Sequence, residues 1–138
     1  MSDRSFVDTN VLVYAFDASA TVKQQRAWRI FEEDYRRLVI STQVLAEFYV
    51  AVTRKLASPL PLGDAEQAVD ALARLSVVAT DAALVVAAVE TSRRHRLSLW
   101  DSLIVQAAKI SGCGRILSED LQTGATIEGV AIVNPFAT

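Results

Sequence analysis

The sequence has one cysteine and one histidine, and this scarcity excludes several kinds of catalytic site. A single cysteine forms neither a disulfide framework nor a thiolate zinc site. His95 would have to serve alone in a Ser-His-Asp triad or a histidine zinc site, and its place in a basic helix end favours a solvated side chain. No phosphate-binding glycine loop of the GxxxxGK[ST] type is present. Cys113, which precedes an apolar run, is expected to be a small buried residue.

Long apolar runs and an excess of basic residues are also missing. No run of about 18 apolar residues is available to span a membrane, and the polar start Met1–Arg4 leads into no signal-type apolar stretch. We therefore expect a cytoplasmic protein. The net charge is −2, so the overall basic footprint of a nucleic-acid binder is absent. Basic residues cluster only at Arg36-Arg37, Arg54-Lys55 and Arg93 to Arg96, which we interpret as solvated helix ends or turns. If the substrate is a nucleic acid, these clusters and bound cations must offset an acidic site.

The residues that are present predict one globular α/β domain over 1–138. Hydrophobic residues make up 51% of the 138 and charged residues 22%. Short apolar runs alternate with longer helical periodicities, which is typical of a parallel sheet covered by helices. The expected strands are 5–7, 38–40, 77–79, 115–117 and 130–133; the expected helices are 10–16, 19–33, 42–55, 64–74, 80–96 and 98–111, with a proline-containing loop at 57–63. Helix caps are expected from Ser19, from Ser41 or Thr42, from Thr80 and from Ser98.

Four carboxylates stand inside or against apolar segments: Asp8, Glu47, Asp101 and Asp120. An ionised side chain in such surroundings needs a partner, and no pattern of buried lysine or arginine accompanies them. Asp8 and Asp120 follow predicted strands, whose carboxyl ends form the edge where α/β sheets build sites. Brought together, four like charges would raise one another's pKa unless a cation neutralised them. Ligands that are all oxygens suit Mg²⁺ or Mn²⁺, and such a site supports phosphodiester hydrolysis.

Each acid also has a purely structural interpretation. Asp8 would cap the next helix, Glu47 would reach water at a helix edge, and Asp101 would form a capping box with Ser98. Asp120 would form an Asx turn. The conjunction of four acids, rather than any one of them, therefore indicates a metal site.

Two other functions remain open. One is phosphoryl transfer through Asp8 as a nucleophile, although Asn10 stands where an aspartate-based phosphatase would have a second acid. The other is a non-catalytic acidic groove that binds a basic peptide.

The motifs around the four acids resemble those of a known family. Val7-Asp8-Thr9-Asn10-Val11-Leu12-Val13-Tyr14 resembles the opening motif of PIN-domain ribonucleases. Glu47 in LAEFY, Asp101 in LWDSLI and Asp120 in LSEDL match the second, third and fourth acids of that family. Their order, their spacing and the length of the chain resemble the VapC toxins of bacterial toxin–antitoxin pairs.

The resemblance implies a fold, an activity and partners. The fold would be a three-layer α/β/α sandwich with a parallel sheet of about five strands. The activity would be Mg²⁺- or Mn²⁺-dependent cleavage of RNA (tRNA or rRNA) that inhibits translation, by a homodimer held inactive by a VapB antitoxin. Asp8, Glu47, Asp101 and Asp120 would be the catalytic and metal-binding acids, and Asn10 and Ser118 would orient ligands or water. Glu119, beside Asp120, departs from the family pattern and leaves open which of the two faces the metal.

Overall fold

The computed structural model describes residues 3–137, so Met1 and Ser2 of the polar start, and Thr138, lie outside the described residues. The strands are β1 (Ser5–Val7), β2 (Leu38–Ser41), β3 (Ser76–Val78), β4 (Arg115–Leu117), β5 (Thr126–Ile127) and β6 (Val130–Val133). The helices are α1 (Thr9–Tyr14), α2 (Thr21–Asp34), the short 3₁₀ helix η1 (Tyr35–Arg37), α3 (Thr42–Arg54), α4 (Leu62–Leu72), α5 (Ala82–His95) and α6 (Leu99–Ile110). No helix among residues 3–137 has the length and apolar character needed to cross a bilayer.

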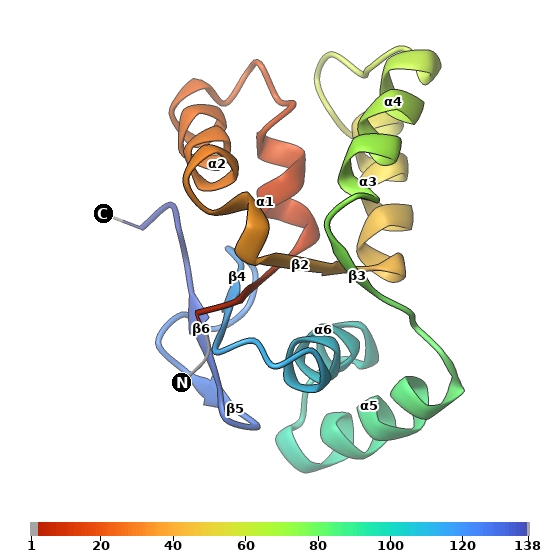
Figure 1. Ribbon diagram of the computed structural model, residues 1–138, viewed down its shortest axis with the longest axis vertical. Helices are drawn as coiled ribbons and strands as arrows, with labels where there is room; N and C mark the ends of the chain where they lie inside the picture. The colour runs from red at the N-terminus through yellow and green to blue at the C-terminus, as the bar shows by residue number, and fades with distance from the viewer. Residues whose placement is uncertain (1–2, 138) are drawn as a thin grey trace.

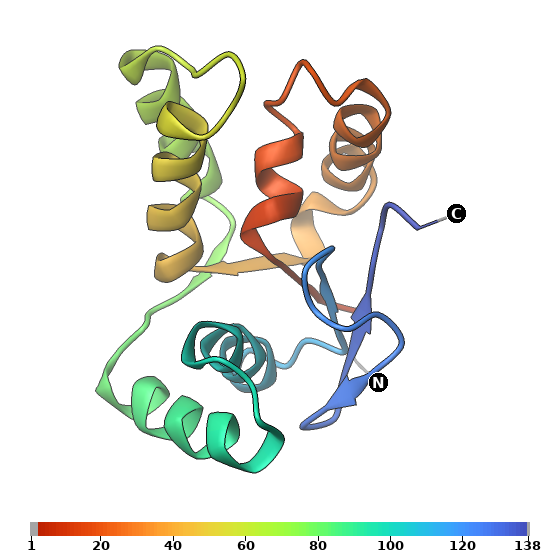
Figure 2. The ribbon, with the colours of Figure 1, turned by 180° about the vertical axis from the view of Figure 1, so that it is seen from behind.

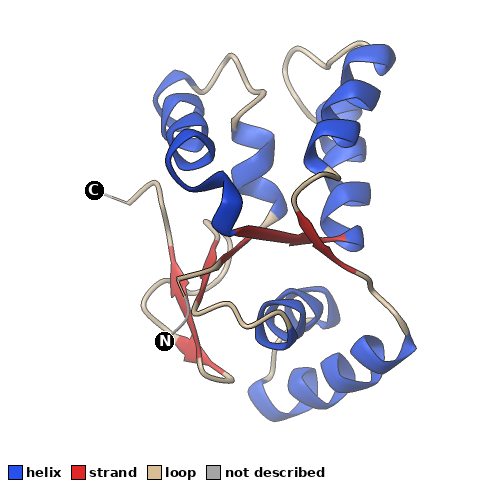
Figure 3. Cartoon of the chain, viewed as in Figure 1, coloured by secondary structure: helices blue, strands red, loops and turns tan. Residues whose placement is uncertain are grey.

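One sheet with the strand order β3-β2-β1-β4-β6-β5 separates two layers of helices. Its first five strands are parallel, and β5 pairs antiparallel with β6. Helices α1 to α4 lie over one face of the sheet, and α5 and α6 lie over the other (Figures 1 and 3). The expected three-layer α/β/α class with a mainly parallel sheet is confirmed. About five strands were expected; the additional strand, β5, was not predicted because a two-residue segment shows no periodicity. It ends at a turn in which Glu128 and Gly129 both have positive φ.

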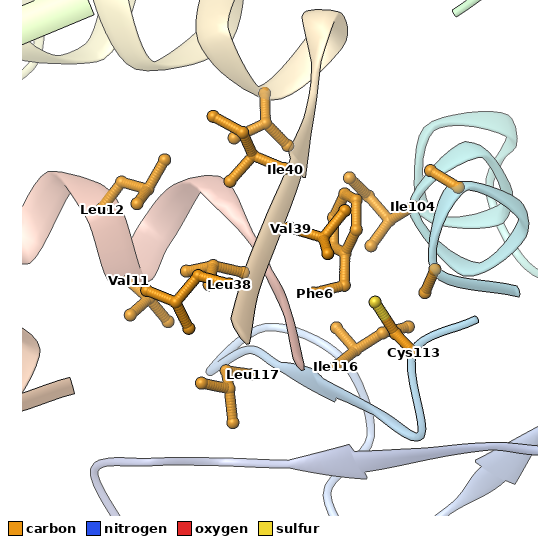
Figure 4. Close-up of a cluster of buried hydrophobic side chains, with 14 of the residues drawn as sticks. Phe6, Val11, Leu12, Leu38, Val39, Ile40, Ile104, Cys113, Ile116 and Leu117 are labelled. Carbon is orange, nitrogen blue, oxygen red and sulfur yellow. The ribbon is translucent and has the colours of Figure 1, made fainter. Parts of the chain in front are cut away.

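The central strands are apolar throughout because helices cover them on both sides. Every residue of β1 and β2 is buried. Along β2, Val39 lies on the side of Ile104 from α6, whereas Ile40 lies on the side of α1 and α3 (Figure 4). Phe6 of β1 joins the α6 side of this core. Cys113 is 6% exposed and packs at the edge of the same core, as its sequence predicted.

Two predicted helix caps are confirmed and two are wrong. The hydroxyls of Ser41 and Ser98 accept backbone hydrogen bonds at the starts of α3 and α6. Thr80 does not cap α5, because the helix begins one residue later and the carboxylate of Asp81 accepts the hydrogen bond instead. An aspartate there also places negative charge at the positive end of the helix dipole. Ser19 does not cap α2, which starts two residues further on without a side-chain cap.

Several predicted element bounds are shifted by one or more residues; for example, α1 was expected over 10–16 and ends at Tyr14. Helix α4 starts at Leu62, inside the stretch expected to be a loop, because Pro61 stands just before the helix, where its missing N–H costs nothing. Strand β3 begins at Ser76, one residue earlier than expected.

Glu128 ties the β5–β6 turn to the two helices on that face of the sheet. Its carboxylate lies 2.8 Å from His95 Nε2, 3.1 Å from Lys109 Nζ and 3.6 Å from Arg94 Nη1. The hydrogen bonds from His95 and Lys109 hold the pKa of Glu128 below its usual range. The basic cluster at the end of α5 is thus partly used in a structural ion-pair network.

Replacing Glu128 with glutamine should lower the free energy of unfolding at pH 7 by roughly 0.5–1 kcal/mol, because Arg94 and Lys109 lose their anionic partner and His95 loses a hydrogen bond to a carboxylate. The lowered pKa means that this stabilisation is present above the pKa of the unfolded chain and is lost as pH falls through the folded pKa. Urea unfolding of both proteins across this range measures the effect. The difference between them should shrink in acid; a difference that grew in acid would contradict the interpretation.

Candidate functional site

The site lies where the strand order reverses. From β1 the chain proceeds outward to β2 and β3 on one side. It then returns to place β4 on the other side of β1, and β6 lies next to β4 in the sheet. Ligands of open α/β sheets bind in the crevice at the carboxyl ends of the strands beside such a reversal. Asp8 directly follows β1 and Ser118 directly follows β4, and the Asp8 N–H donates to the Leu117 carbonyl at 3.0 Å. The two strand ends are therefore locked side by side.

Four side chains from these two strand ends form one hydrogen-bonded group, which we call the Asp8 cluster: Asp8, Asn10, Ser118 and Asp120. Asp8 Oδ2 accepts hydrogen bonds from Ser118 Oγ at 2.7 Å and from Asn10 Nδ2 at 3.2 Å. The same Asn10 nitrogen donates to Asp120 Oδ2 at 3.1 Å. Two carboxylates more than a hundred residues apart thus share one amide group.

Ser118 fixes the turn that carries Asp120. Its side chain is fully buried, and its hydroxyl accepts hydrogen bonds from the backbone N–H groups of Asp120 and Leu121, both at 3.2 Å, while donating to Asp8. Asn10 supports the same turn through its carbonyl oxygen, which accepts from the Glu119 N–H at 3.1 Å. Asn10 and Ser118, which were expected to orient ligands or water, thus hold the two acids and the turn between them by hydrogen bonds.

The surroundings of Asp8 disfavour a negative charge on its carboxylate. Burial raises its pKa, the hydrogen bonds from Ser118 and the Thr9 N–H oppose that rise, and the charges of Asp120 and Glu47 add to it. Thr9 N–H donates to Asp8 Oδ1 at 2.7 Å, so Asp8 also caps α1. The cap and the site use the two oxygens of one carboxylate.

Only Asp8 is buried as its apolar neighbours suggested, at 9% exposed. Glu47 and Asp120 are exposed and Asp101 is half-buried, so the expectation that all four acids lie in apolar surroundings is wrong for these three. The helical period of α3 turns Glu47 to the edge while Phe48 beside it faces the core. Glu47 Oε1 accepts a hydrogen bond from Gln43 at 2.6 Å.

A cavity of about 460 Å³ opens between α1 and α3. These two helices pack against each other on the same face of the sheet (Figure 2). Its lining consists of Thr9, Asn10, Val13, Tyr14, Asp17, Glu47, Val50, Ala51, Lys55, Leu56 and Asp120. Sequence reasoning missed Asp17 and Lys55. A signal was available, because residues 10, 13, 14 and 17, and residues 47, 50, 51 and 55, follow helical spacing on the two facing helices.

Within the described residues, Asp101 does not join the other acids in a group that could hold a metal ion by itself. It lies in the first turn of α6, and α6 covers the face of the sheet opposite to α1 and α3 (Figure 3). Ser98 Oγ accepts from the Asp101 N–H at 3.0 Å, but within residues 3–137 no hydrogen bond or ion pair engages the Asp101 carboxylate. The predicted capping box is therefore only half formed, and capping does not account for the carboxylate.

Glu119 and Asp120 have different surroundings. Glu119 accepts a hydrogen bond from the Tyr14 hydroxyl at 2.7 Å and forms an ion pair with Lys23 of α2, and the Lys23 contact lowers the pKa of Glu119. Asp120 instead contacts Asn10 and lines the cavity. Of the two neighbours, Asp120 is thus the one that belongs to the Asp8 cluster.

The donor set fits a hydrated divalent cation. Within the described residues no three histidine, cysteine, aspartate or glutamate side chains lie close enough to hold an ion by themselves. Mg²⁺, however, is usually bound through one or two carboxylates and keeps several waters, and Asp8 and Asp120 supply two carboxylates. The Thr9 hydroxyl oxygen is buried beside Asp8 and has no hydrogen-bond partner within residues 3–137, which leaves a polar atom for a water or ligand to satisfy.

Comparison with known proteins gives a family and several similar folds. The family model described as the PIN domain matches residues 5–124. A toxin–antitoxin complex from Klebsiella pneumoniae contains a chain with 19% identity and a TM-score of 0.73, the match covering 97% of this chain and 99% of that one. VapC20 of Mycobacterium tuberculosis, described as a sarcin-ricin loop cleaving toxin, has 20% identity and a TM-score of 0.67 over 84% of this chain and 89% of its own. DNA-bound VapBC from Salmonella typhimurium gives 20% identity and 0.68 over 96% and 97%. At these identities the likeness concerns the fold. No curated protein matches the chain.

Replacing Ser118 with alanine should lower the free energy of unfolding by about 1–3 kcal/mol, because it leaves the buried Leu121 N–H and the partly buried Asp120 N–H without their acceptor. Chemical denaturation measures the change. Ser19→Ala, which removes an exposed hydroxyl bonded only to Asp17, serves as the control and should change stability little. Equal effects of the two substitutions would show that Ser118 does not hold the turn.

Proposed function

Because the chain belongs to the PIN domain family, we propose that it is a cytoplasmic Mg²⁺- or Mn²⁺-dependent endoribonuclease and the toxin of a toxin–antitoxin pair. The observation that carries the proposal is the Asp8–Asp120 pair, which Asn10 joins at the carboxyl edge of the sheet, with Asn10 and Asp120 lining a cavity. The similar fold of VapC20, a sarcin-ricin loop cleaving toxin, supports RNA as the substrate class. Cleavage of tRNA or rRNA would inhibit translation.

In this proposal, Asp8 and Asp120 hold the divalent cation, and Asn10 and Ser118 keep their oxygens in place. The bound cation would supply Lewis-acid activation of water and neutralise charge on the phosphate. Glu47 faces the pair from α3 and is suited to orient a water molecule, because its charge is felt at Asp8 while one of its oxygens remains exposed. Asp101 would complete the acid set from α6, since no structural contact engages its carboxylate among residues 3–137.

The partners are proposed on the same grounds. Similar folds occur in a toxin–antitoxin complex and in DNA-bound VapBC. An antitoxin of the VapB kind is therefore the proposed protein partner, and a homodimer is the proposed assembly of the toxin.

The geometry argues against Asp8 as a phosphoryl-accepting nucleophile. Its two oxygens together accept three hydrogen bonds, from Thr9, Asn10 and Ser118. Such bonds reduce the nucleophilicity of a carboxylate, and Asn10 stands where an aspartate-based phosphatase would have its second acid. Phosphodiester hydrolysis needs neither.

Purified protein incubated with cellular RNA and Mn²⁺ should give discrete cleavage products that EDTA abolishes. Asp120→Asn should reduce the rate of cleavage roughly 100-fold or more, because the site loses one of the two carboxylates proposed to hold the cation. Glu119→Gln is the matched control: it changes the adjacent acid, which is paired with Lys23, and should retain activity within about tenfold. If Glu119→Gln lost activity and Asp120→Asn kept it, the metal-binding role would belong to Glu119 and the assignment to Asp120 would be wrong. Cleavage that resists EDTA would contradict metal dependence.

Thermal unfolding separates the enzyme from a groove that only docks a peptide. Mn²⁺ at about 100 times its dissociation constant should stabilise the folded protein by roughly 2.7 kcal/mol, because ligand binding to the native state acts by mass action. Asp8→Asn should remove most of this shift. No shift in the unmodified protein would favour the docking groove.

A further inference from the structure

The cavity beside the Asp8 cluster has one cationic side chain in its wall. Of its lining residues within the described part of the chain, Asp17, Glu47 and Asp120 are acidic and only Lys55 is basic. Asp8 adds a further negative charge just beneath the surface. A polyanion that enters this cavity is repelled at the acidic end and attracted only near Lys55.

Lys55 and the acids stand at opposite ends of one helix face. Glu47, Ala51 and Lys55 are spaced four residues apart, so they lie in one row along α3. Eight residues of helix separate Glu47 from Lys55 by about 12 Å along the axis. The wall between them is apolar, formed by Val50 and Ala51, and Leu56 lies beside the lysine.

The charge of Lys55 has no partner within residues 3–137. The Lys55 N–H donates to the Ala51 carbonyl at 2.9 Å and closes the helix, but no hydrogen bond or ion pair engages its ammonium group within residues 3–137. Arg54 stands in the last turn of α3 and Lys55 is the residue that caps it, at the end where the helix dipole favours a cation. Only Lys55 lines the cavity, so the dipole alone does not account for its position.

We propose that Lys55 binds a backbone phosphate of the RNA substrate that flanks the bond to be cut. The flanking nucleotide then lies along α3, with its base or ribose against Val50, Ala51 and Leu56. This inference rests on the proposed ribonuclease function and adds a fixed contact that sets how the strand enters the site.

The test is the binding of a fluorescein-labelled single-stranded RNA in EDTA, measured by anisotropy at several salt concentrations. Lys55→Gln should weaken binding roughly fivefold to tenfold at low salt and reduce the magnitude of the slope of log K against log salt by about 0.7, as expected for one lost phosphate contact. Arg54→Gln removes an equal charge one residue away but outside the cavity, and should change affinity by less than about twofold. Lys55→Arg should restore binding, because it keeps the charge.

The outcomes separate this inference from the function on which it rests. With Mn²⁺, Lys55→Gln should raise KM for RNA cleavage and leave kcat within about twofold, because it removes binding remote from the reacting phosphate. Equal losses of affinity in Lys55→Gln and Arg54→Gln would overturn the inference, since they would reflect only the general field of the helix end. RNA cleavage by the unmodified protein together with unchanged binding by Lys55→Gln would overturn it while leaving the ribonuclease intact. If the unmodified protein neither bound nor cleaved RNA, both proposals would fail.

Discussion

The amide of Asn10 is the contact on which the site depends. It donates to Asp8 and Asp120 and accepts from the Glu119 backbone, so it joins the end of β1 to the turn after β4. The two strand ends are neighbours because β4 pairs with β1 on the side opposite to β2, although the chain passes through β2 and β3 before it reaches β4. The same reversal of strand order that leaves a crevice also brings together acids from distant parts of the sequence.

The resulting cavity has an electrostatic polarity that bears on its chemistry. Its acidic end holds a buried carboxylate whose pKa is raised by burial and by neighbouring charge, so a bound cation would relieve a cost already present in the fold. Its other end carries Lys55. A negatively charged strand that spans both ends is oriented by this arrangement before any base is recognised. The acidic net charge of the whole chain is therefore compatible with a nucleic-acid substrate, because the local arrangement decides the interaction.

Local sequence predicted the features that depend on neighbours along the chain. The buried runs of β1 and β2, the caps of α3 and α6, and the positions of Asp8 and Asp120 after strands all follow from patterns a few residues long. The features that were missed depend on packing. Asp17 and Lys55 line the same cavity because α1 packs against α3. Glu119 forms an ion pair with Lys23 of α2 and so does not join the Asp8 cluster. The site role of Asp101 stays a prediction: its motif resembles that of the family, and among residues 3–137 no hydrogen bond or ion pair engages its carboxylate.

The most direct test of the account is a crystal structure with Mn²⁺, in which anomalous scattering locates the ion. The account predicts one strong peak between Asp8 and Asp120, about 2.0–2.2 Å from an oxygen of each carboxylate, with waters completing the coordination. A peak elsewhere, or none beside Asp8 at saturating Mn²⁺, would contradict the claim that this pair of strand-end carboxylates is a metal site.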